Sequence, residues 1–192
     1  MRLLKEKDLQ TYQHSLRVGE LCKRMAVYLH LNEKQTRQLV QGSCLHDIGK
    51  VGIPDEILNK SSALTAQEWE VMRQHPYIGT KILLEHGDIE TEIIEIIHYH
   101  HERWNGEGYP CGLKENKIPV FARICAIIDT FDCMVSDRPY RKGLSFAEAE
   151  QELLIHSGTQ FDSYYVDAFL NLFHTIGVNT LSRKIRQEGD TL

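Results

Sequence analysis

The sequence lacks a long apolar run, a strong excess of one charge and closely paired cysteines, and each absence excludes a class of protein. No stretch is long and apolar enough to cross a bilayer, and the segment 1–8 lacks the apolar core of a secretion signal. The formal net charge is −5, whereas a general nucleic-acid binder normally presents a basic face. We therefore expect a cytoplasmic protein with no membrane span and no polymeric nucleic-acid partner.

The cysteine count also argues against a disulfide framework. The chain has five cysteines, an odd number, and no two of them form a C-x-x-C pair. Three of them lie in apolar helical patterns, namely Cys22, Cys44 and Cys125. Reduced thiols, as in a cytosolic protein, are the expected state.

The length and the apolar pattern predict one all-α domain. A chain of 192 residues suits a single domain, and we expect it to span 1–192, with a core over about 8–176 and a tail over about 178–192. Apolar residues recur at helical spacing, and no run alternates as a strand would. The charged opening would serve equally well as the end of a linker in a longer sensor protein.

Eight helices are expected from this pattern and from end signals. Two capping boxes mark helix starts, Thr65 to Glu68 and Ser145 to Glu148. Several glycines and a proline interrupt residues 102–117, which predicts an ordered loop. The expected helices cover about 8–29, 33–48, 65–75, 77–86, 89–101, 119–135, 146–156 and 162–176.

The histidines and aspartates suggest a metal site. Five histidines fall near predicted helix ends or on inward faces, namely His14, His46, His75, His100 and His101. Asp47 follows one of them, and Asp129 lies on an otherwise apolar helix face, where a carboxylate needs a compensating cation. Neutral imidazoles and carboxylates are typical metal ligands, and these seven residues suffice for two ions if one carboxylate bridges them. We expect Asp47 to be the bridge.

Spacing alone leaves a simpler interpretation open, because adjacent His-Asp and His-His pairs also arise by chance. The remaining histidines are interpreted as surface or core side chains, namely His30, His86, His98, His156 and His174.

Seven segments, taken in order, carry a family resemblance. They are His14–Val18, His46–Lys50, Gly52–Asp55, His75–Gly79, His100–Pro110 with its Gly-Tyr-Pro triplet, and Asp129–Asp132 followed by Asp137–Arg141. Over about residues 10–173 the chain resembles the HD-GYP domain, a branch of the HD phosphohydrolase superfamily.

This resemblance implies a fold and an activity. The fold would be an HD-domain helical bundle whose helix ends converge on a dinuclear metal site. The activity would be that of a phosphodiesterase that hydrolyses a cyclic dinucleotide second messenger to a linear dinucleotide and perhaps GMP. Cyclic di-GMP is the first expectation and cyclic GMP-AMP the second. A sensor or receiver domain, or a diguanylate cyclase domain, is the expected partner.

The resemblance also implies roles for individual residues. One metal would take His14, His46, Asp47 and Asp129, and the other would take Asp47, His75, His100 and His101. Asp47 and Lys50 would serve catalysis, with Lys50 on the scissile phosphate, while Arg138 and Arg141 would grip phosphate oxygens.

The expected ions are iron or manganese, with nickel, cobalt, magnesium or zinc as further candidates. Some family members carry a third metal on a glutamate that corresponds to Gln10. A neutral amide is a poor ligand beside anionic competitors, so we expect two metals.

Two alternatives remain. The chain would otherwise be another HD-type enzyme that cleaves a nucleoside polyphosphate or monophosphate, or an inactive module that binds a messenger or a partner protein. The Gly-Tyr-Pro loop and the arginine segment argue against the first alternative, and the complete set of seven ligand candidates argues against the second.

Overall fold

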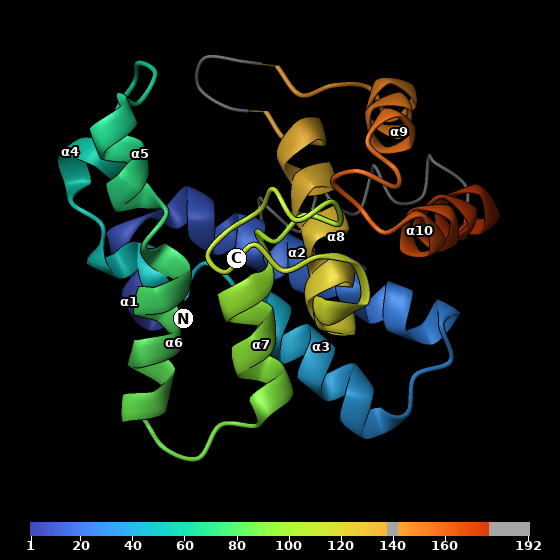
Figure 1. The fold of residues 1–192 in the computed structure, drawn as a ribbon, viewed down its shortest axis with the longest axis horizontal. Helices are drawn as coiled ribbons and strands as arrows, with labels where there is room; N and C mark the ends of the chain where they lie inside the picture. The colour runs from blue at the N-terminus through green and yellow to red at the C-terminus, as the bar shows by residue number, and fades with distance from the viewer. Residues whose placement is uncertain (138–141, 177–192) are drawn as a thin grey trace.

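The described part of the protein is a bundle of helices. A computed structural model describes residues 1–137 and 142–176, in which no strand occurs beyond an isolated bridge between Ser157 and Phe161 (Figure 1). The elements are α1 Arg2–Lys7, α2 Leu9–Tyr28, α3 Glu33–Leu45, the 3₁₀ turn η1 Ile48–Gly52, α4 Asp55–Leu58, α5 Ala66–Met72, α6 His75–Glu85, α7 Thr91–Tyr99, η2 Glu115–Lys117, α8 Val120–Val135, α9 Phe146–Ile155 and α10 Ser163–Ile176. The all-α prediction is confirmed.

Local capping explains where several helices begin. The predicted boxes at Thr65 and Ser145 are both present, each with reciprocal bonds to a glutamate three residues on. A third box joins Asn32 and Gln35 at the start of α3. Each box satisfies amide groups that the first helical turn leaves without partners.

The observed elements differ from the sequence prediction in three places. The break between the predicted helices 65–75 and 77–86 falls earlier, because α5 ends at Met72 and α6 begins at His75. A short helix, α1, precedes the first predicted one, and Asp8 separates them by accepting a hydrogen bond from the Gln10 amide. The predicted helix 33–48 ends earlier, at Leu45, and the chain tightens into η1 after Asp47.

The apolar core gathers around α8, which packs against α2, α7, α9 and α10 (Figure 1). The Phe131 ring lies 5.1 Å from that of Phe169 and 4.8 Å from that of Phe173, so aromatic contacts join α8 to α10. On the other side of the bundle, α6 packs against η1 and α7. These contacts fix the ends of α2, α7 and α8 relative to η1 and the start of α6.

Within residues 1–137 and 142–176, no helix is long and apolar enough to span a membrane. The predicted tail over about 178–192 falls outside the described residues, and the assignment of 1–192 to a single domain stays a prediction.

Candidate metal centre

Five of the seven predicted ligands line one cavity of about 1060 Å³, which α5, α8 and the loop 102–117 also help to line, and the ligand atoms of His46 and His75 lie close to those five. His14 comes from α2, Asp129 from α8, and the other five from the ends of α3, α6 and α7. In Figure 1 the loop crosses the end of α7 toward α8.

Three of the histidines are oriented by the same kind of hydrogen bond. The Nδ1 atoms of His46, His75 and His100 each donate to the backbone carbonyl three residues earlier, at 2.7, 2.8 and 2.9 Å. The carbonyl can only accept, so Nδ1 carries the proton and the Nε2 atom is left to face the other ligand-type side chains. This arrangement orients metal-binding imidazoles in proteins.

One group of ligand atoms surrounds His75. Its Nε2 lies 3.3 Å from Nε2 of His100 and 3.1 Å from Nε2 of His101. The same atom lies 3.4 Å from Oδ1 of Asp47. Imidazole lone pairs and a carboxylate that converge in this way are the typical ligands of a shared cation.

A second group surrounds His14 and His46. Nε2 of His14 lies 2.9 Å from Oδ1 of Asp129, and Nε2 of His46 lies 3.3 Å from Oδ2 of Asp47. Although His46 is fully buried, its Nε2 has no hydrogen-bond partner among the residues that the structure describes. Asp47 belongs to both groups, with Oδ1 toward His75 and Oδ2 toward His46, which is the position of a bridging ligand.

Burial and charge divide the histidines into two kinds. Burial lowers the pKa of His75 to about 4, and burial together with neighbouring His75 lowers that of His101 to about 3. Burial also holds the pKa of His100 well below its usual value. These three imidazoles are therefore neutral near pH 7, the form that binds metals.

His14 and His46 behave oppositely. Burial lowers the pKa of each, but the adjacent aspartates outweigh burial and raise both values to about 9. For Asp47, burial opposes ionisation, but Lys50 and His46 outweigh it and hold the pKa well below its usual value. Protonated His14 and His46 place positive charge next to the buried carboxylates of Asp47 and Asp129, as a bound divalent ion would. The donor set fits a metal centre.

Lys50 adds a cation at the cavity wall. Its Nζ lies 2.7 Å from Oδ2 of Asp47, and its side chain is 23% exposed. Burial lowers the Lys50 pKa, but Asp47 outweighs burial and raises it, so the ammonium stays charged.

Sequence reasoning assigned no role to Asp132, which is fully buried behind His14. Its carboxylate accepts a hydrogen bond from Nδ1 of His14 at 2.7 Å and a bidentate pair from Arg17 at 2.9 and 2.8 Å. Asp132 thereby directs Nε2 of His14 toward Asp129. The available signal was a second carboxylate on the apolar face of the predicted helix 119–135.

We expect Asp132→Asn to weaken metal binding by about 10- to 100-fold, the usual effect of losing a hydrogen bond to a ligand. The amide removes the negative charge that holds His14, while its shape is nearly unchanged. Metal titration of the apo-protein measures the effect. Glu20→Gln is the matched control, because Glu20 pairs with Arg24 elsewhere on α2. Equal affinity in Asp132→Asn and the wild type would contradict the assignment.

The loop that carries the Gly-Tyr-Pro triplet is anchored beside this centre. The buried Glu102 carboxylate accepts hydrogen bonds from the backbone amides of Cys111 and Leu113, at 2.7 and 3.0 Å. The Tyr109 ring stacks on His101, with centroids 4.7 Å apart. The guanidinium of Arg73, which follows α5, lies 5.4 Å from the centroid of the Tyr109 ring. The predicted ordered loop is confirmed, and it covers one side of the His101 ring.

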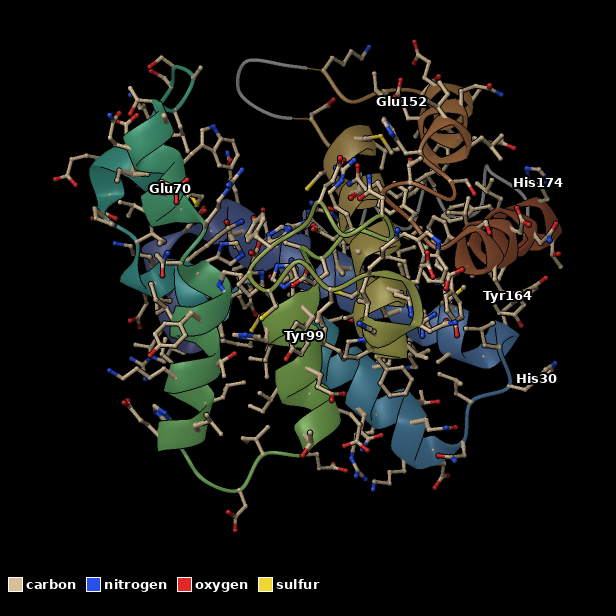
Figure 2. All side chains as sticks on the ribbon, in the orientation of Figure 1. His30, Glu70, Tyr99, Glu152, Tyr164 and His174 are labelled. Atoms are coloured by element: carbon tan, nitrogen blue, oxygen red, sulfur yellow. The ribbon has the colours of Figure 1, made fainter. Side chains whose placement is uncertain are left out.

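The other residues considered in the sequence do not belong to the candidate ligand groups in the described part of the chain. None of the five other histidines belongs to a candidate metal group among the described residues, and Figure 2 shows His30 and His174 at the outside of the molecule. Gln10 lines the cavity. Arg138 and Arg141 fall outside the described residues.

Comparisons with known proteins point in one direction. A family model described as "HD domain" matches residues 1–164. The "Cyclic di-GMP phosphodiesterase" of Thermotoga maritima is 43% identical over 167 residues, which cover 86% of this chain and 45% of that protein. The "3'3'-cGAMP-specific phosphodiesterase 2" of Vibrio cholerae is 37% identical over 162 residues, covering 84% of this chain and 31% of that protein.

A solved structure shares the fold. Bd1817 of Bdellovibrio bacteriovorus, described as an HDG"Y"P protein, superposes with a TM-score of 0.69 at 23% identity, over 84% of this chain and 52% of that one. The chain spans less than half the length of the two curated relatives.

Proposed function

The chain belongs to the HD domain family, in its HD-GYP branch, and from this membership we propose that it hydrolyses a phosphodiester bond of a cyclic dinucleotide, with cyclic di-GMP preferred. The observation that carries the proposal is the gathering of seven ligand-type side chains in overlapping groups, five of which line a cavity of about 1060 Å³ together with Lys50. A cavity of this volume is large enough for a small-molecule ligand.

We propose two divalent metal ions, with Asp47 shared between them. His14, His46 and Asp129 would complete one site, and the other would take the ligands His75, His100 and His101. When bound, such ions polarise a phosphoryl oxygen and activate water as a nucleophile at neutral pH. Iron or manganese is proposed first, and nickel, cobalt, magnesium or zinc also suit these donors. Gln10 is the reason for proposing two ions rather than three.

The chain's own residues would orient and neutralise the substrate. The Lys50 ammonium faces the cavity next to Asp47, where it would stabilise charge that builds on the phosphoryl oxygens. Arg138 and Arg141 are proposed to hold phosphate oxygens, and this role rests on the family resemblance. The net reaction adds one water and breaks one P–O3′ bond, which leaves a free 3′ hydroxyl and a 5′ phosphate on a linear dinucleotide. A second round would give GMP.

We also propose a cytoplasmic location and a sensor, receiver or diguanylate cyclase domain as partner. Five free thiols support the location. The greater length of the curated relatives supports a partner domain.

A substrate panel tests the proposal. Anaerobically purified, metal-loaded protein would be incubated with cyclic di-GMP, cyclic GMP-AMP, a dNTP or guanosine tetraphosphate, and the products separated by chromatography. We expect linear dinucleotide from cyclic di-GMP. Faster cleavage of cyclic GMP-AMP than of cyclic di-GMP would indicate that the substrate preference is that in the name of the Vibrio cholerae relative. Cleavage of only the dNTP or the tetraphosphate would indicate another HD-type hydrolase, and binding of cyclic dinucleotide without cleavage would indicate an inactive module.

A further inference from the structure

Cys133 lies inside the metal centre, although neither the sequence nor the proposed ligand sets assign it a role. It follows Asp129 by one turn of α8, and its half-buried side chain lines the cavity. The Cys133 sulfur lies 3.6 Å from Oδ1 of Asp129. Ligand atoms of His14, Asp129 and Cys133 all lie within 4.8 Å of one another.

These separations match those between ligands of one ion. A sulfur about 2.3 Å and an oxygen about 2.1 Å from the same ion lie roughly 3.1 to 3.6 Å apart, depending on the angle between the bonds. The sulfur-to-oxygen distance of 3.6 Å falls at the tetrahedral end of this range. Nε2 of His14 lies 2.9 Å from the same oxygen, which suits two ligands whose bonds to one ion meet at about 90°.

Cysteine binds metals as a thiolate. A divalent ion between the Cys133 sulfur and Oδ1 of Asp129 would take the place of the thiol proton, which points toward that oxygen.

We propose that Cys133 is a further ligand of the ion held by His14 and Asp129, bound through its thiolate after the thiol proton passes to solvent. This inference rests on the metal centre of the proposed function. Thiolate is a soft ligand, so Cys133 would make this site favour Fe²⁺, Co²⁺ or Zn²⁺ over Mn²⁺ or Mg²⁺. The competing explanation is a plain hydrogen bond, in which the thiol keeps its proton and donates to Asp129.

Cobalt spectroscopy distinguishes a metal-bound thiolate from a hydrogen-bonded thiol. Apo-protein would be titrated anaerobically with Co²⁺, whose visible bands report binding and whose near-ultraviolet charge-transfer band reports a bond to sulfur. The wild type is expected to show both. Cys133→Ser and Cys133→Ala are expected to keep the visible bands and lose the charge-transfer band. The ratio of their Co²⁺ affinity to their Mn²⁺ affinity is expected to fall about tenfold. Cys111→Ala is the control, because Cys111 is exposed and lies outside the three groups of candidate ligands.

The outcomes are distinct. Visible bands without a charge-transfer band in the wild type would overturn the thiolate ligand and leave the metal centre standing. A charge-transfer band that persists in both Cys133 variants would also overturn it. Failure of Co²⁺ to bind at all would overturn the metal centre itself, and this inference with it.

Discussion

Asp47→Ala is expected to empty both metal sites and to lower phosphodiesterase activity by about 10³-fold or more, the scale of loss when one member of a catalytic unit is removed. Asp47 is the residue whose two oxygens face both groups of ligands, at 3.4 Å from His75 and 3.3 Å from His46. His46→Ala is expected to abolish activity similarly but to remove the ion beside His14 first, because the Nε2 of His46 faces that group.

Metal content of anaerobically purified variants, measured by mass spectrometry, tests this difference together with turnover of cyclic di-GMP. His98→Ala is the matched control. His98 lies on α7 close to His100, but its Nδ1 faces Thr80 at 3.2 Å and it belongs to neither ligand group. Circular dichroism would show whether each variant keeps its helices. Full metal content in Asp47→Ala would overturn the shared-ligand assignment, and full content in His46→Ala would overturn its place in the site.

The sequence predicted those features that local patterns determine. The capping boxes at Thr65 and Ser145 and the long apolar helix before Val135 each depend on residues within a few positions of one another. The short helix α1 was missed, because the charged opening of the chain was interpreted as a possible linker end.

The candidate ligands were selected by residue type and by family resemblance, and the structure adds the contacts between distant segments. The bond between His14 and Asp132 joins residues 118 positions apart, so no local spacing reveals it. The position of Cys133 beside Asp129 is local, since one helical turn separates them, but its relation to His14 depends on how α2 and α8 pack. Packing between helices is the part that apolar periodicity alone does not specify.

Among these contacts between distant segments, we expect the close approach of η1 to α6 to matter most for stability and metal binding. A β-carbon at Gly49 would lie 1.8 Å from the carbonyl oxygen of His75 and 2.5 Å from the amide nitrogen of Gly79. Both atoms belong to the backbone, so no side-chain rotation relieves the overlap. The chain can pack η1 on the start of α6 at this distance because residue 49 has no side chain.

Gly49→Ala is therefore expected to lower the free energy of unfolding by about 3 kcal/mol, at the upper end of the cost of over-packing. The displacement would also spoil the metal centre, because η1 follows Asp47 and carries Lys50 while α6 begins at His75. Urea unfolding of the apo-proteins and metal titration of the folded variants measure the two effects separately.

Gly52→Ala provides the comparison within the same turn. Its β-carbon would meet Cγ2 of Ile78 at 2.9 Å, and that methyl group lies on a side chain that can move. We expect a loss of about 1 kcal/mol or less and near-normal metal affinity, since a flexible neighbour relieves part of the strain. If Gly49→Ala proved as stable and as tight-binding as Gly52→Ala, backbone contact between η1 and α6 would not be what sets the distance from Asp47 to His75.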